Sequence, residues 1–192
     1  MKKKNIIVAV TGATGALYAL KLVDYLATRS DIDVSLIVSD NGKLIFEHET
    51  GISINELYKK CDYVYENDDL SAPIASGSFK RSGMIIIPCS IKTMSAIALS
   101  MASNLIIRAA DVNLKEKMPL VICLRETPLH LGHLKNLSRL AEIGGIVFPL
   151  SPSFYHKPKS IEEIVDFTVG RVLDLLGIDN ELSRPYTGIE EE

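Results

Sequence analysis

Short, nearly continuous apolar runs recur along the chain and indicate strands that are buried on both faces. They read NIIVAV at residues 5–10, VSLIV at 34–38, GMIIIP at 83–88 and PLVICL at 119–124, and a shorter run lies at 146–148. Strands of a sheet with one solvated face alternate apolar and polar residues, and these runs do not. The pattern therefore predicts a parallel sheet that is covered on both sides.

Helical periodicity fills the segments between these runs. Apolar residues recur every three or four positions, and Ser39 and Ser53 stand where helix N-caps are expected. Strands that alternate with helices predict an α/β fold, a Rossmann-like or flavodoxin-like three-layer sandwich with a mostly parallel central sheet. Helices are expected at residues 16–28, 40–49, 53–60, 93–102, a further segment ending at 115, 131–143 and 160–176, and a loop at 66–82.

The length of 192 residues suits one domain, with a core at about residues 5–176 and a C-terminal tail at 177–192. The last three residues of that tail are glutamates, which are expected to be frayed and solvated. Hydrophobic residues make up 47% and charged residues 23%, as in an ordinary globular protein. The net charge of −3 excludes a generally basic nucleic-acid binder.

The cysteines and the apolar runs also bear on location. Cys61, Cys89 and Cys123 form no CxxC pair, so a reducing compartment, the cytoplasm, is expected. The apolar run at residues 6–10 is too short for a signal peptide. No stretch reaches the roughly 18 apolar residues of a transmembrane helix, so no membrane contact is expected.

The first candidate for chemistry is the turn after the first strand, Thr11-Gly12-Ala13-Thr14-Gly15. In such folds ligands bind beyond the carboxyl ends of the strands. The glycines let the backbone approach a ligand closely, the Thr14 hydroxyl can donate, and the helix start offers free N–H groups to a phosphate. The segment is neither a GxGxxG fingerprint nor a Walker loop, so a tight turn that needs glycine is an equal interpretation.

A second candidate follows the third strand, in the segment Cys89-Ser90-Ile91-Lys92-Thr93. Its hydroxyl groups either cap the next helix or donate to a phosphate or a ring. Cys89 fits a small buried side chain better than a nucleophile.

Charged residues form two further candidates. Arg125 and Glu126 follow the fourth strand, and arginine suits bidentate contact with phosphate, so a ligand role is favoured over an exposed loop ion pair. Arg108 and Lys115 lie two helical turns apart on one face. Taken alone, that face is best explained as solvated, with ion pairs inside the helix.

The C-terminal third adds an aromatic surface and a histidine pair. Tyr155 lies in a proline-rich loop, and Phe167 and Arg171 lie beside the apolar stripe of the last helix, which suggests a second buried surface between subunits. His130 and His133 have metal-ligand spacing, but no third ligand is evident. No metal site is expected.

Several of these segments together resemble one family from about residue 5 to 176: VTGATGALYALKL, SGSF, PCSIKTMSAIA, RAADVNLKEKMPLVICLRETPLHLGHL, AEIGGIVFP and FYHKP. The chain is similar to flavin prenyltransferases of the UbiX type, within the flavin-containing cysteine decarboxylases. The resemblance implies transfer of a dimethylallyl group from dimethylallyl monophosphate to N5 and C6 of reduced FMN, without a metal. The product, prenylated FMN, serves a partner decarboxylase of the UbiD type.

The resemblance also implies roles for particular residues. Glu49, Glu126 and Lys115 are expected to be catalytic, with Glu49 as the acid/base group of ring closure. The prenyl phosphate is expected on Arg108, Lys115, Tyr155 and Arg171. The flavin site is expected to comprise Gly12, Ala13, Thr14, Ser39, Ser90, Ile91, Lys92, Thr93 and Arg125.

Several features qualify the resemblance. The family often has serine where this chain has Thr14, which keeps the hydroxyl and adds a methyl group near the flavin. The PCSIKT segment differs from the PASANT-type segment of the cysteine decarboxylases, which argues against decarboxylation of a peptidyl cysteine. The family forms homododecamers, which fits the Phe167–Arg171 surface.

Two alternative functions stay open, a flavin-dependent decarboxylase of aromatic acids and a non-catalytic FMN carrier or accessory subunit.

Overall fold

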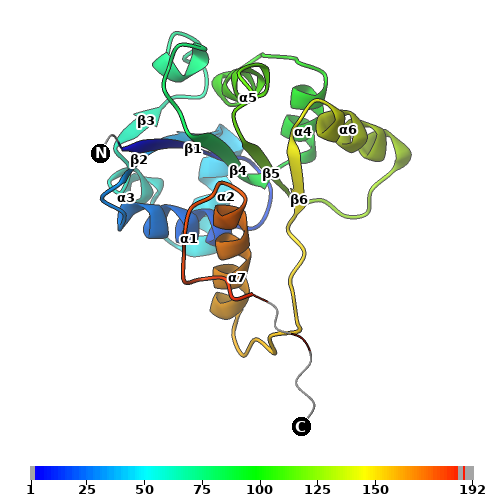
Figure 1. Cartoon of the computed structure of the whole chain (residues 1–192). Coiled ribbons are helices and arrows are strands. Elements are labelled where there is room, and N and C mark those ends of the chain that lie inside the picture. The colour runs from blue at the N-terminus through cyan, green and yellow to red at the C-terminus, as the bar shows by residue number, and fades with distance from the viewer. Residues whose placement is uncertain (1–2, 186–187, 189–192) are drawn as a thin grey trace.

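The computed structural model describes residues 3–185 and 188, and within them six strands form one parallel sheet (Figure 1). The order across the sheet is β3-β2-β1-β4-β5-β6. The α/β fold with a parallel sheet is confirmed. The strands are β1 (Lys4–Val10), β2 (Ile32–Val38), β3 (Tyr63–Tyr65), β4 (Gly83–Cys89), β5 (Leu120–Leu124) and β6 (Ile146–Pro149).

Helices cover both faces of the sheet and make three layers (Figure 1). Side chains of β1 alternate between the two cores, with Ile6 and Val8 on the side of α1 and α7, and Ile7 and Ala9 on the side of α4 and α5. This alternation explains why the strand is apolar at every position. The helices are α1 (Ala16–Ala27), α2 (Asp40–Thr50), α3 (Ile54–Tyr58), α4 (Ile91–Ala98), α5 (Leu105–Lys115), α6 (Leu131–Glu142) and α7 (Ile161–Asp174), with a 3₁₀ turn η1 (Pro73–Ala75).

Two elements depart from the prediction. Strand β3 was not predicted, because an exposed three-residue edge strand carries too short a pattern. The helix expected at 93–102 begins at Ile91 and ends at Ala98. Asn104 then caps α5 by accepting from the Ile107 N–H at 3.0 Å, so the chain makes two helices with a break between them.

The apolar stripe of α6 is only partly buried. Leu140 is fully buried, but Leu131 and Leu134 at the other end of the helix are 66% and 49% exposed. The predicted stripe therefore has a half that the single chain leaves uncovered. The Nδ1 of His130 accepts from the Gly132 N–H at 3.1 Å, so this histidine caps α6.

The C-terminal tail packs onto α1 and α7 as far as it is described. The Tyr25 hydroxyl donates to the Glu181 carboxylate at 3.0 Å, and Asn180 Nδ2 donates to the Gly170 carbonyl at 3.2 Å. The predicted fraying of the last three residues lies outside the described residues. Among the helices that are described, none has the length and apolar character needed to span a bilayer.

The sheet has its topological switch point between β1 and β4. The chain continues from β1 to β2 on one side and from β4 to β5 on the other, so the loops after β1 and β4 diverge. Thr11 joins the two strand ends, because its hydroxyl donates to the Pro88 carbonyl at 2.8 Å and accepts from the Ser90 N–H at 2.7 Å. A crevice opens where the loops part.

Candidate active site

A cavity of about 520 Å³ lies at this switch point, beyond the carboxyl ends of the strands. Every residue expected at the flavin site lines it, and Glu126 lines it as well. The turns after β1, β2, β4 and β5 meet here, because parallel strands all end at the same edge of the sheet. The lining residues are Thr11, Gly12, Ala13, Thr14, Ser39, Asp40, Asn41, Asn67, Ser90, Ile91, Lys92, Thr93, Asn104, Ile106, Ile107, Arg125 and Glu126.

Two helix N-termini offer the cavity backbone donors. Helices α2 and α4 begin at its wall, where Ser39 accepts from the Gly42 N–H at 3.1 Å and Ser90 from the Thr93 N–H at 3.4 Å. The first two N–H groups of each helix have no acceptor among the described residues, and they carry the partial positive charge of a helix start. They are those of Asp40 and Asn41 in α2 and of Ile91 and Lys92 in α4. Both termini therefore suit an anion such as a phosphate.

Two other helix starts nearby are already satisfied. The carboxylate of Glu49 accepts from the N–H groups of Gly15 and Ala16, at 2.9 and 2.8 Å, and so caps α1. Asn67 accepts from the first two N–H groups of α5 through its carbonyl and its side chain. Two of the N–H groups that this helix start was expected to offer to a phosphate, those of Gly15 and Ala16, are therefore occupied by an acidic side chain distant in sequence.

Glu49 faces a second, smaller cavity of about 340 Å³, and Thr14 lines both cavities. Burial raises the pKa of Glu49, but hydrogen bonds from Thr14, Ala16 and Gly15 outweigh this effect and hold the pKa below its ordinary value. Glu49 is therefore an anion at neutral pH. Its carboxylate accepts from the N–H of Gly15, the residue that follows Thr14 in the lining of the larger cavity.

Gly12 is required where the first turn meets α2. A side chain there would place its Cβ 2.5 Å from the Cβ of Asn41, which is closer than carbon atoms approach. Gly15 has a φ of +112°, a conformation that favours glycine. Gly12 thus serves the close contact of the first turn with α2 at the cavity wall, and Gly15 serves the backbone conformation of the turn.

Arg125 and Glu126 lie at the rim of the cavity after β5. The Arg125 N–H donates to the Cys89 carbonyl at 3.1 Å, which holds the start of this loop against the end of β4. Within the described residues no ion pair joins Arg125 to Glu126, and the Glu126 carboxylate accepts from the Thr127 N–H at 3.0 Å instead. The Arg125 side chain is exposed and free to meet an anionic ligand.

The residues expected to hold a prenyl phosphate do not line this cavity. Arg108 pairs with Asp111 at 3.2 Å, Lys115 pairs with its neighbour Glu116, and Arg171 pairs with Asp174 at 2.6 Å. The Tyr155 ring lies edge-on to Phe167, with centroids 5.8 Å apart. Because α5 and α7 cover opposite faces of the sheet, one chain does not bring these cations together (Figure 1).

Known flavoproteins match this chain over most of its length. The family model named Flavoprotein matches residues 1–173. The flavin prenyltransferase UbiX of Thauera aromatica is 46% identical over 187 residues, which is 97% of this chain and 96% of that protein. The UbiX of Escherichia coli K12 is 45% identical, over 91% and 93% of the two chains. This chain belongs to the flavin prenyltransferases of the UbiX type.

Solved structures of UbiX proteins share the fold closely. AnUbiX (PadA1), in complex with FMN and dimethylallyl pyrophosphate, superposes with a TM-score of 0.94 at 39% identity, over 98% of this chain and 100% of that one. The dodecameric FMN-dependent UbiX-like decarboxylase of E. coli O157:H7 gives 0.93 at 38% identity, over 96% and 100%. The peptidyl-cysteine decarboxylase EpiD, at 19% identity, shares the fold alone.

Sequence reasoning missed several lining residues of this UbiX-type chain. Thr11 belongs to the first turn but carries no role among the residues expected at the site, although its position at the end of a buried strand is a usable signal. Asn104 precedes the apolar run of α5 as an N-cap does. Asn67 carries no local signal, because its contacts with α5 come from a loop 37 residues earlier in the chain than Asn104 and exist only in the folded state.

Proposed function

We propose that this chain transfers a dimethylallyl group from dimethylallyl monophosphate to reduced FMN and makes prenylated FMN. The observation that carries the proposal is the cavity of about 520 Å³ between two free helix N-termini, in a chain that belongs to the UbiX-type flavin prenyltransferases. Its volume falls within the range of small-molecule sites. The relative AnUbiX binds FMN and a dimethylallyl diphosphate in the same fold.

The residues around the cavity fit FMN. The N-termini of α2 and α4 suit its phosphate, and the hydroxyls of Thr14, Ser90 and Thr93 are further donors to phosphate or ring. Arg125 and Lys92 add positive charge at the rim. When it is bound, reduced FMN supplies the nucleophilic N5 and C6 atoms.

In the proposal, three cationic side chains of this protein stabilise the phosphate that leaves the prenyl donor. As the carbon–oxygen bond of the donor breaks, phosphate leaves with the electron pair and gains negative charge. Arg108, Lys115 and Arg171 are the proposed partners of that phosphate, with the Tyr155 hydroxyl as a donor. No group of three or more metal-ligating side chains occurs among the described residues, so the proposal assigns the charge to these side chains.

Two carboxylates serve as proton acceptors in the proposal. Bond formation at C6 releases a proton, and Glu49 is the proposed base because its carboxylate is ionised and adjoins Thr14 at the cavity wall. Glu126, which lines the larger cavity, is a second proposed acid/base group. Apolar walls protect a reactive allylic group from water, and Ile91, Ile106 and Ile107 supply such surface.

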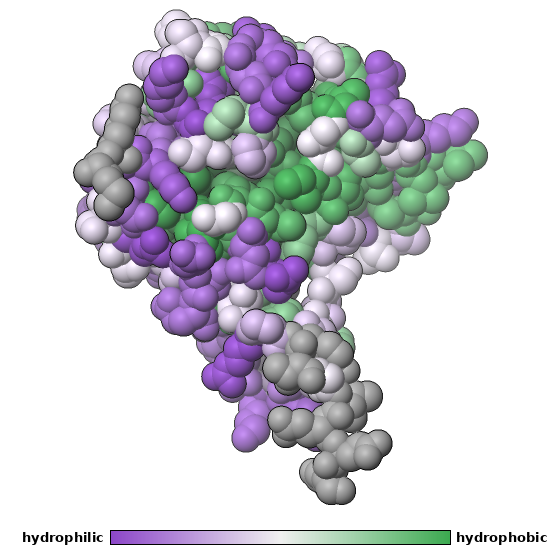
Figure 2. All heavy atoms as spheres, in the orientation of Figure 1, coloured by the Kyte–Doolittle hydropathy of each residue, from purple (hydrophilic) through white to green (hydrophobic). Residues whose placement is uncertain are grey.

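A homododecamer is part of the proposal, because one chain leaves the donor cations apart. The relative from E. coli O157:H7 is dodecameric. Apolar surface extends to the α6 side of the molecule (Figure 2), where the exposed side chains include Leu129, Leu131, Leu134 and Ile143. A neighbouring copy can bury this surface and bring its own Arg171 and Tyr155 to the cavity of the first.

A UbiD-type decarboxylase is the proposed recipient of the product. The proposed location is the cytoplasm, and its support is the free thiol state of Cys61, Cys89 and Cys123. Neither point depends on the geometry of the cavity.

The deciding experiment is anaerobic incubation of the protein with reduced FMN and dimethylallyl monophosphate, followed by mass analysis of the released flavin. A gain of one C5 unit is expected, and the diphosphate is tested in parallel because AnUbiX binds it. Unchanged FMN on a protein that binds it would favour a flavin carrier. Release of CO₂ from an aromatic acid by the protein alone would favour a decarboxylase, as some structural relatives are named.

A further inference from the structure

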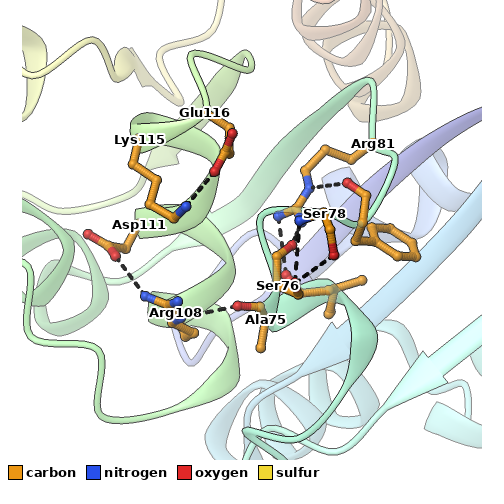
Figure 3. A network of polar contacts seen from close by, with 10 residues as sticks. Ala75, Ser76, Ser78, Arg81, Arg108, Asp111, Lys115 and Glu116 are labelled. Atoms are coloured by element: carbon orange, nitrogen blue, oxygen red, sulfur yellow. Dashed lines mark hydrogen bonds and ion pairs between the residues drawn. The ribbon is translucent and has the colours of Figure 1, made fainter.

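Arg81 is a buried arginine that the proposed function does not use. Only 7% of its surface is exposed, and no carboxylate among the described residues forms an ion pair with it. Its guanidinium instead donates to three backbone carbonyls, those of Phe79 at 3.3 Å, Ile74 at 3.2 Å and Ser76 (Figure 3). A buried cation is costly unless it is fully hydrogen-bonded, so these carbonyls must be held in place around it.

The carbonyls belong to one loop, residues 74–79, which packs against α5. The carbonyls of Ile74 and Ser76 accept from Arg81, and the carbonyl between them, that of Ala75, accepts from Arg108 Nε at 3.2 Å. Successive carbonyls thus alternate between two guanidinium groups (Figure 3). A shift of the loop away from Arg81 would also move the acceptor of Arg108.

The same loop reaches the other cation of α5. A Cβ on Gly77 would lie 2.3 Å from Glu116 Oε1 and 2.8 Å from Lys115 Nζ, so the loop backbone lies directly against this ion pair. The hydroxyls of Ser76 and Ser78 are 2.9 Å apart and stiffen the turn. The loop therefore runs along α5 from Arg108 to Lys115 and contacts both cations.

We propose that Arg81 is a positioning residue, which fixes loop 74–79 on α5 and thereby orients Arg108 and Lys115 toward the phosphate of the prenyl donor. The inference rests on the proposed function of those two cations. Arg81 does not line the flavin cavity, so its effect is expected on the donor and not on the flavin. Arg108 Nη2 has no acceptor among the described residues, which leaves that nitrogen for a ligand.

The kinetic test compares Arg81→Met with Arg81→Lys and with the control Lys80→Met. Lys80 is the neighbouring residue and is an exposed cation of the same segment. We expect Arg81→Met to raise the KM for dimethylallyl monophosphate about 10-fold and to change the KM for reduced FMN less than about 2-fold, as loss of oriented charge-assisted contacts would do. Lys80→Met is expected to change neither, and Arg81→Lys to restore part of the loss.

Hydrogen exchange tests the loop without reference to activity. The amides of Ala75, Ser76 and Phe79 are hydrogen-bonded inside the loop, and we expect them to exchange faster in Arg81→Met than in the wild type or in Lys80→Met. Unchanged exchange would overturn the claim that Arg81 holds the loop. Should Arg81→Met fail to fold, Arg81→Lys carries both measurements, because it keeps the charge and loses the planar fork.

The outcomes separate the two proposals. A wild type that makes prenylated FMN, with equal changes in both KM values in Arg81→Met, would overturn the positioning role alone. A wild type that makes no prenylated FMN would overturn the proposed function and the donor part of this inference. In that case the exchange rates still decide whether Arg81 fixes the loop.

Discussion

The flavin cavity and the donor cations are built in different ways. The cavity is formed by strand ends and helix N-termini of one chain, held together by contacts such as those of Thr11 with Pro88 and Ser90. The proposed donor cations are side chains that are exposed, in Lys115 and Arg171, or half-buried, in Arg108, and each pairs with an acid one or three residues away. The proposed flavin site, made of backbone at one sheet edge, is formed within one chain, whereas the proposed donor site, made of side chains on opposite faces, is expected to need a second copy.

The local ion pairs do not oppose that second site. Exposed pairs contribute about 0–1 kcal/mol each, because water screens them. A phosphate that meets several cations at once in a space closed to water gains more than this. We therefore expect the acids beside Arg108, Lys115 and Arg171 to hold these cations in place until a donor binds.

Glu49→Gln is expected to have the largest effect, because it removes a proposed base at the wall between the two cavities. We expect FMN affinity to stay within about 3-fold, and formation of prenylated FMN to fall about 100-fold, with the reaction stalled after the first bond. The control is Glu47→Gln on the same helix, whose carboxylate accepts from the Ile54 N–H at 2.9 Å and so caps α3. Wild-type product formation by Glu49→Gln would remove Glu49 from the chemistry.

Arg171→Ala tests whether the cation of α7 belongs to the donor site. We expect the KM for dimethylallyl monophosphate to rise about 30-fold, and the KM for reduced FMN to stay within about 2-fold. The control is Arg29→Ala, since Arg29 is a half-buried arginine away from the proposed site that also pairs with a nearby acid, Asp31, at 2.9 Å. Equal changes in the KM for dimethylallyl monophosphate and the KM for reduced FMN would show that Arg171 does not belong to a separate donor site.

Thr11→Val tests the flavin cavity, because it is expected to weaken the binding of FMN and to leave the binding of the donor unchanged. It leaves the Ser90 N–H without its partner and removes one of the two donors to the Pro88 carbonyl, which keeps the Thr11 N–H at 3.2 Å. We therefore expect the free energy of unfolding to fall by about 2 kcal/mol and FMN to bind about 10-fold more weakly. The donor KM at saturating FMN should not change. Thr28→Val, which removes a hydroxyl contact with the Tyr25 carbonyl at 2.7 Å, is the control away from the cavity. Normal FMN binding by Thr11→Val would show that this link does not shape the site.

The contribution of Glu49 to stability is expected to depend on pH. Its pKa in the folded chain lies below the ordinary value of 4.5, so its cap of α1 stabilises the fold at neutral pH and is lost as the pH falls through the folded pKa. The Tm difference between wild type and Glu49→Gln should be constant from about pH 6 to 8 and should shrink below about pH 4.5. A difference that grows toward acid pH would contradict this sign.

Asn113→Leu is expected to have the smallest effect and to touch neither region. Asn113 is fully buried in α5, where Nδ2 donates to the Ala109 carbonyl at 2.8 Å and Oδ1 has no hydrogen-bond partner. Replacing it with an apolar side chain removes the unsatisfied oxygen, so the free energy of unfolding should stay equal or rise by about 1 kcal/mol. Chemical denaturation measures the free energy of unfolding. A large loss of stability would show that the hydrogen bond of Nδ2 stabilises the fold more than the unsatisfied Oδ1 destabilises it.

Local patterns were sufficient to predict most of the fold and to indicate residues that line the cavity at the sheet edge. A strand buried on both faces must be apolar at every position, and helices between such strands place every strand's carboxyl end at the same edge. The segments after 5–10, 83–88 and 119–124 could therefore be assigned to one site without coordinates. The resemblance to UbiX-type proteins, carried by the same segments, is confirmed by the family comparison.

The tertiary structure alone decided which groups are free and which are already bonded. Glu49 caps α1 from another helix, and Asn67 caps α5 from a distant loop. The sequence does not contain these facts in readable form, because a hydrogen bond depends on distance and direction between atoms that are far apart along the chain. Periodicity determines which face of an element is buried, and only the packing of those faces determines what each polar group meets.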